Sequence, residues 1–302
     1  MQNTFSKSVI FIILAGFAAL AATPEGEWER FADGSTGRVT EFRGAGGVAI
    51  AAYVRKPAGP GPFPVVIDLH GGNPNVEAPY RYGRATNGSA PSYIAEGWTI
   101  YAIDYRPNGP GRAAPMDPIE YDDTMAAIET ARHLSFIDSN RVALTGGSHG
   151  GHVMNRMASR VDASCAVLSS PTWIDSGQMK RALAQEKDPA VLGRLKLLMS
   201  FVDQIKDPAV RQAFDRASAL DEAPRVRCPL LIIDGGKDIS LPQWMVREYE
   251  AKLRAAGKTV ETYLPAEGDH GFNNGASPEG REAQRLTFAF LKKYLGTAKG
   301  KP

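Results

Sequence analysis

The stretch LTGGSHGGH, residues 144–152, places four glycines around one serine and two histidines. It follows the apolar run RVALT, which predicts a strand, and precedes a helical pattern that starts near His149. Gly146, Ser148 and Gly150 form a G-x-S-x-G pattern, and glycines at these two positions leave room for a tight turn from strand to helix. Such a turn holds the serine in strained backbone angles and points its hydroxyl away from the sheet. The stretch therefore predicts a nucleophilic serine at position 148.

Two other interpretations concern the same stretch. A phosphate-binding loop is disfavoured because no lysine follows the glycines, and a glycine-rich turn with an incidental serine stays open. His149 starts the predicted helix and His152 lies one turn further on, facing the packing side, so we expect structural roles for both side chains. The backbone N–H of His149 lies in the first helical turn, where it has no helical partner, and is expected to help bind an oxyanion.

Apolar runs alternate with helical patterns along most of the chain, which predicts an α/β fold. We expect eight strands in a mostly parallel sheet with helices on both faces. The strands are RVTEF (38–42), GVAIAAYV (47–54), VVIDL (65–69), WTIYAID (98–104), RVALT (141–145), CAVLS (165–169), LLIID (230–234) and VETYL (260–264), the first two antiparallel. The helices cover about 89–96, 117–134, 149–160, 242–256 and 279–295. The long charged segment 174–220 predicts a helical cap insertion over one end of the sheet, with disorder as the alternative.

An acid and a base should follow the serine at the carboxyl ends of later strands. Asp238 follows LLIID, and His270 follows VETYL. We expect His270 to act as general base toward Ser148, while Asp238 orients the imidazole and stabilises its charged form. The competing acids are Asp234, Glu267 and Asp269. The first is expected to lie too deep in its strand, and the other two adjoin the histidine too closely to reach its far ring nitrogen.

The segment HGGN, residues 70–73, follows the strand VVIDL. Its small residues let the backbone approach a substrate carbonyl, so the N–H of Gly72, or that of Gly71, is expected to complete an oxyanion hole with His149. His70 is expected to brace this loop, and His133 to be a surface or packing residue. The aromatic residues expected to line the substrate pocket are Tyr80, Tyr82 and Trp173. For Trp173, a place in the core under the cap is the open alternative.

Five segments carry a resemblance to a known family: VVIDLHGG, AIDYRPNGPGR, YDDTMAAIETARHLSFIDSNRVALTGGSHGGH, APRVRCPLLIIDGGKDISLP and EGDHGF. Their order and spacing resemble the α/β-hydrolase fold, within it the catalytic domain of the prolyl oligopeptidase group and the dienelactone hydrolase-like esterases. GGSHGG is especially similar to the acylaminoacyl peptidases. The resemblance implies a triad of Ser148, Asp238 and His270, with the N–H groups of Gly72 and His149 as oxyanion donors. It also implies structural roles for Asp104, Arg106, Asp122, Asp123, Asp138 and Arg141.

The sequence departs from these relatives in two places. The region before the strand at 65–69 is too short for the β-propeller that precedes this domain in the peptidases. Asp234 stands where relatives often have a histidine before the glycine.

Composition and the first residues restrict partners and location. The 302 residues are 43% hydrophobic with a net charge of +2 and no basic block, so nucleic acid is not an expected partner. One lysine precedes the apolar run 9–22, which predicts a signal peptide over residues 1–22, cleaved near Ala21 or Ala22. Residues 23–302 would then form one secreted or periplasmic α/β-hydrolase domain without stable membrane insertion. An uncleaved N-terminal anchor is the alternative.

Cys165 and Cys228 are too few for a metal cluster, and whether they pair stays open.

The sequence thus predicts a serine hydrolase that cleaves carboxylic esters through an acyl-enzyme, with no metal or cofactor. The alternatives are an exo-acting peptidase or amidase on short peptides, a polysaccharide deacetylase, and a binding protein on a hydrolase frame that has lost its chemistry. Substrate identity and oligomeric state do not follow from the sequence.

Overall fold

The computed structural model describes residues 27–72, 83, 89–106, 117–172, 175–216 and 218–296. One nine-stranded sheet has the order β1-β2-β3-β5-β4-β6-β7-β8-β9. Its strands are β1 (Glu29–Arg30), β2 (Thr36–Arg43), β3 (Ala49–Lys56), β4 (Phe63–Leu69), β5 (Thr99–Ile103), β6 (Ile137–Gly147), β7 (Cys165–Ser169), β8 (Leu230–Ile233) and β9 (Val260–Tyr263). The first three strands and the β3–β5 pair are antiparallel, whereas the remaining pairs are parallel.

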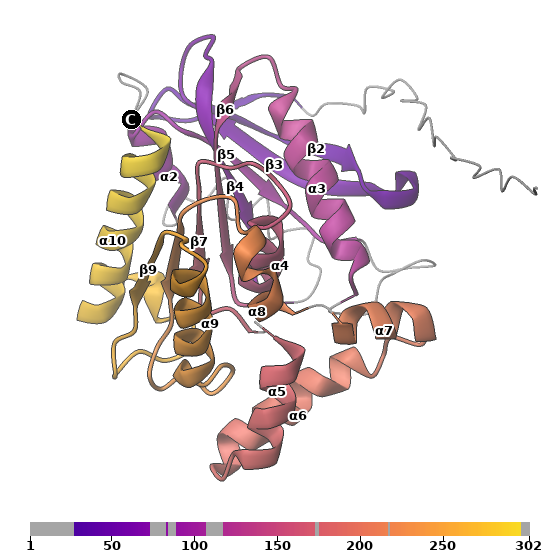
Figure 1. Ribbon diagram of the computed structural model, residues 1–302. Helices are drawn as coiled ribbons and strands as arrows, with labels where there is room; N and C mark the ends of the chain where they lie inside the picture. The colour runs from indigo at the N-terminus through magenta and orange to yellow at the C-terminus, as the bar shows by residue number, and fades with distance from the viewer. Residues whose placement is uncertain are drawn as a thin grey trace, which may run out of the picture.

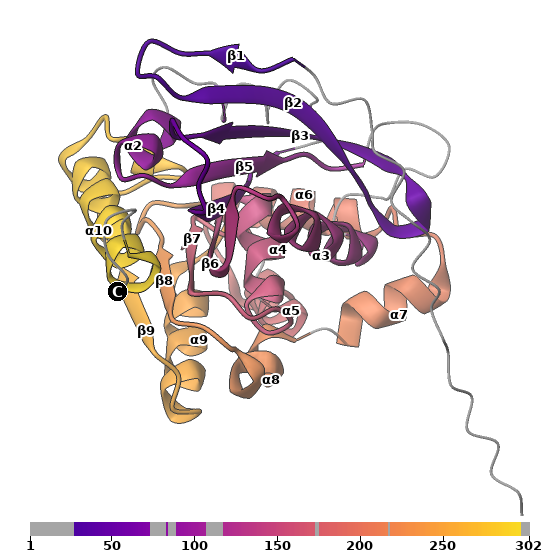
Figure 2. The same ribbon diagram turned by 90° about the horizontal axis from the view of Figure 1, so that it is seen from above.

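Helices cover both faces of the sheet (Figures 1 and 2). One face carries α3 (Ile119–Arg132), α4 (His149–Met157) and α9 (Gln243–Ala255), and the other carries α2 (Ser89–Ala95) and α10 (Pro278–Leu295). Because successive side chains of a strand point to opposite faces, β4 contributes Val65 and Ile67 to one hydrophobic core and Val66 to the other. Strands buried on both faces need the continuous apolar runs that the sequence contains.

The predicted fold class is confirmed, and the structure adds a ninth strand. This strand, β1, has only two residues and pairs with Gly37 and Thr36 of β2. The helices fall where the sequence predicts them, although α4 ends at Met157 rather than near residue 160.

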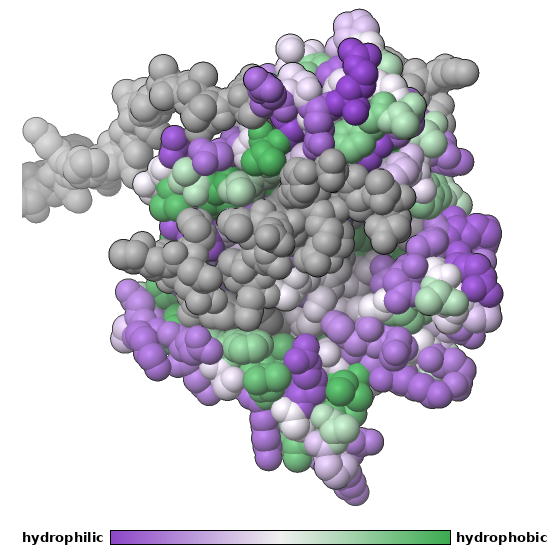
Figure 3. Space-filling model, turned by 180° about the vertical axis from the view of Figure 1, so that it is seen from behind, coloured by the Kyte–Doolittle hydropathy of each residue, from purple (hydrophilic) through white to green (hydrophobic). Residues whose placement is uncertain are grey.

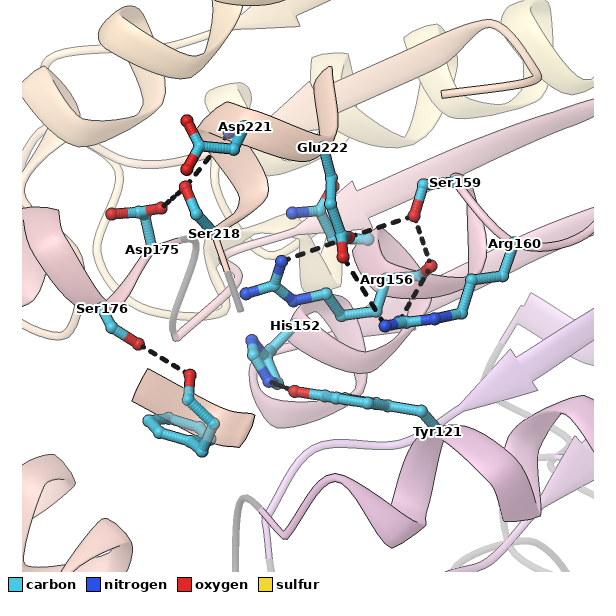
Figure 4. Close-up of polar contacts among 12 residues, drawn as sticks. Tyr121, His152, Arg156, Ser159, Arg160, Asp175, Ser176, Ser218, Asp221 and Glu222 are labelled. Carbon is cyan, nitrogen blue, oxygen red and sulfur yellow. Dashed lines mark hydrogen bonds and ion pairs between the residues drawn. The ribbon is translucent and has the colours of Figure 1, made fainter. Parts of the chain in front are cut away.

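Four helices lie between β7 and β8 in the chain. The first three lie beyond the carboxyl ends of the parallel strands, whereas the fourth lies beside α9 (Figure 1). They are α5 (Ser176–Gln185), α6 (Pro189–Val202), α7 (Pro208–Arg216) and α8 (Ala219–Glu222), and together we call them the cap. Asp175 caps the N-terminus of α5, and Ser218 caps that of α8. The Ser218 hydroxyl donates to the Asp175 carboxylate, so the two ends of the cap meet at one point (Figure 4).

Cys165 and Cys228 are both buried free thiols. Cys165 belongs to the core under α2 and α10, whereas Cys228 belongs to the core under α3, α4 and α9. In the structure, Cys165 and Cys228 are therefore not joined by a disulfide.

Hydrophilic and hydrophobic side chains are interspersed over the coloured part of the face in Figure 3. Within the described residues, no helix combines the length and the apolar character needed to cross a membrane.

Candidate active site

Ser148 stands at the junction of β6 and α4 in a strained conformation, with φ 54° and ψ −120°. Its amide donates to the Ser169 carbonyl of β7 at 2.9 Å, which holds the turn against the neighbouring strand. Glycine is required on both sides of the serine. A Cβ at Gly146 would lie 2.4 Å from the Gly150 carbonyl oxygen, and a Cβ at Gly150 would lie 2.0 Å from the Leu69 carbonyl oxygen. The backbone thus adopts the tight turn that the sequence predicts.

Ser148, His270 and Asp238 form one continuous chain of hydrogen bonds. The Ser148 hydroxyl lies 2.9 Å from Nε2 of His270, and Nδ1 of His270 lies 2.7 Å from Oδ2 of Asp238. The three side chains come from the ends of β6, β8 and β9, which parallel pairing brings to the same edge of the sheet. With the imidazole neutral, the Nδ1 proton bonds to the carboxylate and Nε2 is left to accept the hydroxyl proton.

The loops that carry the acid and the base are tied together. The Lys237 amide donates to the Gly268 carbonyl at 2.8 Å, and the Gly236 amide donates to the Pro265 carbonyl at 2.8 Å. On the base side, the Gly271 amide donates to the Ser170 hydroxyl at 3.2 Å. These bonds fix the separation between Asp238 and His270.

Sequence reasoning missed three residues that support this chain, namely Ser170, Ser240 and Arg194. The Ser240 amide donates to Oδ1 of Asp238 at 2.6 Å, while Nε of Arg194 on α6 donates to the Ser240 hydroxyl at 3.0 Å. A bond from an aspartate to the amide two residues on is common in turns, so the D-I-S pattern could have indicated Ser240. No sequence signal reveals Arg194, because its contact spans 46 residues. The cap is therefore connected directly to the loop of Asp238.

Both histidines beside Ser148 have other partners. Nε2 of His149 lies 2.8 Å from the Glu120 carboxylate on α3. The His152 ring is fully buried, and its Nε2 lies 2.8 Å from the Tyr121 hydroxyl (Figure 4). These contacts agree with the expectation that both side chains are structural.

The loop after β4 is anchored through His70. Nε2 of His70 lies 3.0 Å from the buried Asp104 carboxylate, and the Tyr105 hydroxyl donates to the His70 carbonyl at 2.7 Å. The next residue, Gly71, lies so close to the serine that a Cβ at Gly71 would be 2.8 Å from the Cβ of Ser148. Gly72 has a φ of 80°, in the left-handed region that favours glycine.

Several other sequence-predicted residues lie away from this hydrogen-bonded chain or outside the described residues. His133 is exposed at the end of α3, and Asp138 and Arg141 form an ion pair, as do Arg106 and Asp123. Glu267 is exposed and contacts Lys237, away from the hydrogen-bonded chain. Tyr80, Tyr82 and Trp173 lie outside the described residues. Among the described residues, no group of three or more histidine, cysteine, aspartate or glutamate side chains is arranged to hold a metal ion.

We compared the sequence with models of known protein families. The model of the prolyl oligopeptidase family matches residues 116–298, which is more than half of the sequence. The chain belongs to the prolyl oligopeptidase family. Among curated proteins, the chain is 26% identical over 239 residues to the esterase LipC of Mycobacterium tuberculosis, and 26% identical over 262 residues to the uncharacterized peptidase YuxL of Bacillus subtilis. These alignments cover 70% and 80% of this chain but only 54% and 36% of the relatives.

Solved structures of the same fold include both kinds of hydrolase. An esterase of Pyrococcus furiosus superposes with a TM-score of 0.60 at 20% identity, covering 90% of this chain and 94% of the esterase. The acylaminoacyl peptidase of Pyrococcus horikoshii superposes with a TM-score of 0.60 at 19% identity, covering 87% of this chain and 42% of the peptidase. The chain therefore shares the fold of an esterase and of part of a peptidase.

Proposed function

We propose that this hydrolase cleaves carboxylic esters through an acyl-enzyme formed on Ser148. The observation that carries the proposal is the unbroken chain from Ser148 through His270 to Asp238, with the serine in a strained turn. Nucleophilic catalysis by serine requires a general base within hydrogen-bonding distance of the hydroxyl group, and His270 meets this requirement.

The geometry supports one sequence of steps. The Ser148 oxygen attacks the acyl carbon while His270 accepts the hydroxyl proton, and His270 then gives that proton to the leaving alcohol. Asp238 accepts a hydrogen bond from Nδ1 and stabilises the charged imidazole. The amide of His149, at the first turn of α4, and an amide of Gly71 or Gly72 would hold the oxyanion. Water, activated by His270, then releases the acid.

Two observations favour esters over peptides. The Pyrococcus furiosus esterase matches this chain over 94% of its own length, whereas the acylaminoacyl peptidase matches over only 42% of its length. Peptide cleavage at a chain end also requires a site for a charged terminus, and the sequence singles out no such group in the cap.

The substrate preference is tested with a matched pair, p-nitrophenyl acetate and p-nitroacetanilide, which differ only in the scissile bond. We expect a higher kcat/KM for the ester. An equal kcat/KM for the anilide, or for a short peptide anilide, would favour the peptidase alternative. Absence of turnover on both, in a folded sample, would favour the binding protein.

His149→Ala is expected to retain activity. Its ring contacts Glu120 and its contribution to the oxyanion site is a backbone amide, which alanine preserves. Loss of one side-chain hydrogen bond, worth about 1 kcal/mol, would reduce kcat/KM by no more than about tenfold. The measurement is ester hydrolysis beside His270→Ala, and equal losses in the two variants would contradict the assignment of the base.

We also propose export, because residues 1–22 carry the lysine, apolar run and small residues of a signal peptide. The secreted protein should then begin after Ala21 or Ala22 by intact mass, and a product that retains these residues would contradict the proposal.

A further inference from the structure

Asp234, directly after β8, is a fully buried carboxyl group, with 0% of its surface exposed. Both of its carboxyl oxygens are buried, and neither makes a hydrogen bond of ordinary geometry with the described residues. The Gly235 amide is the one backbone donor that acts on this carboxyl group. A buried carboxylate with so little hydrogen bonding and no cation is strongly disfavoured, whereas a neutral carboxylic acid can itself donate one hydrogen bond. The surroundings of Asp234 therefore favour the protonated form.

The acceptor that faces this group is Asp238. The Asp238 carboxyl lies within hydrogen-bonding reach of the Asp234 carboxyl, and Asp238 is the titratable residue whose charge acts on Asp234. Asp238 already accepts from Nδ1 of His270 through Oδ2 and from the Ser240 amide through Oδ1. It is thus hydrogen-bonded as a carboxylate should be, and each of its oxygens has a further lone pair. Two carboxyl groups in contact cannot both carry a charge at low cost, so one proton between them is the stable state.

Among the described residues, no lysine, arginine or histidine is a group whose charge acts on Asp234. The Asp234 amide donates to the Tyr263 carbonyl of β9 at 3.1 Å, and Nε2 of Gln243 on α9 donates to the Asp234 carbonyl at 3.1 Å. The nearest lysine in sequence, Lys237, instead pairs with Glu267, and both of these side chains are exposed.

We propose that Asp234 is a neutral carboxylic acid whose O–H donates to the Asp238 carboxylate, and that it thereby acts as a positioning residue for the hydrogen-bonded chain to Ser148. Burial and the neighbouring Asp238 charge raise the pKa of Asp234 to about 9, which agrees with a proton held at neutral pH. This hydrogen bond holds the Asp238 carboxylate in place and withdraws negative charge from it. Its effect on catalysis rests on the proposed function, but the protonation of Asp234 does not.

Stability should change with pH in a defined direction. The pKa of Asp234 is raised above its unfolded value of 3.8, so folding binds a proton between that pH and about 9. The contribution of this group is therefore fully present below about pH 4 and decreases as pH rises toward 9. Asp234→Asn keeps a donor toward Asp238 and cannot ionise. We expect its Tm to exceed that of the wild type at pH 8 and the difference to shrink toward pH 4.

The pH dependence of kcat/KM distinguishes a hydrogen-bond donor role of Asp234 from a merely structural one. Asp234→Leu has similar volume but no donor, so Asp238 keeps more negative charge and His270 holds its proton to higher pH. We expect the acid limb of the kcat/KM profile to move to higher pH in Asp234→Leu and to stay in place in Asp234→Asn. An equal displacement of the limb in both variants would overturn the donor role.

Protonation is measured directly by carboxyl ¹³C NMR of aspartate-labelled protein. Burial also raises the pKa of Asp68, so the Asp234 resonance is identified by its loss in Asp234→Asn and the Asp68 resonance by its loss in Asp68→Asn. We expect the Asp234 carboxyl to stay protonated at pH 7. A resonance that titrates near pH 4 with the exposed aspartates would overturn the proposal. This arm requires no turnover, so failure of the ester hypothesis and failure of the Asp234 proposal remain distinguishable.

Discussion

Ser148→Ala is expected to lower kcat for ester hydrolysis by a factor on the order of 10⁵. The variant removes the only atom that can form the acyl-enzyme and leaves the backbone turn, the base and the acid in place. His270→Ala should cause a loss of similar size, and the double variant should be little worse than either single one, because the two residues act as one unit. The measurement is kcat and KM for p-nitrophenyl acetate.

The stability of the serine variants provides an internal control. The strained angles of Ser148, φ 54° and ψ −120°, are poorly tolerated by alanine but readily adopted by glycine. Ser148→Gly should therefore be more stable than Ser148→Ala by about 1 kcal/mol, although both are inactive. Residual activity near that of the wild type in either variant would place the nucleophile elsewhere.

Gly150→Ala is expected to destabilise the protein by about 3 kcal/mol, since the added methyl group meets backbone rather than a flexible side chain. Its Cβ would lie 2.0 Å from the Leu69 carbonyl oxygen and 2.7 Å from that of His70. To relieve the clash, α4 and the loop after β4 must separate, and this loop carries Gly71 toward Ser148. Activity should therefore fall together with the free energy of unfolding, measured by urea denaturation.

Gly193→Ala is the matched control. Gly193 lies within α6, and a Cβ there would meet nothing within 4 Å. The same substitution should stabilise the protein by about 1 kcal/mol through helix propensity and leave activity unchanged. Equal free energies of unfolding for Gly150→Ala and the wild type would contradict the close contact between α4 and β4.

The turn at Ser148 could be predicted because its constraint is local. Two glycines, a preceding β-rich run and a following helix are all visible within 141–157, and each has a steric reason. Asp238 and His270 lie far from Ser148 in sequence, but parallel strands end at one edge of the sheet, so their position after β8 and β9 was sufficient to predict the contact.

Contacts made by side chains of different elements could not be predicted in this way. The Glu120 contact of His149 joins α3 to α4, and the Arg194 contact of Ser240 joins the cap to the acid loop. Neither contact belongs to a sequence motif. Each depends on the angle at which two elements pack, and the sequence pattern does not give this angle. Similarly, the two residues of β1 show no periodicity, so only pairing with β2 defines them.

Asp234 illustrates a partial prediction. The sequence indicates a deep position at the end of its strand, and the structure agrees, with the side chain fully buried. Its contact with Asp238 depends on how the chain turns over the intervening residues, which hydrophobic periodicity does not describe.

The central claim is that Ser148 is the activated nucleophile of a serine hydrolase. Labelling with a fluorophosphonate, followed by peptide mapping, tests it most directly, because the reagent modifies a serine only when a base activates it. We predict a single adduct on Ser148 in the wild type and in Ser200→Ala, which changes an exposed serine of α6, and no adduct in Ser148→Ala. An adduct on another residue, or none on the folded wild type, would contradict the account.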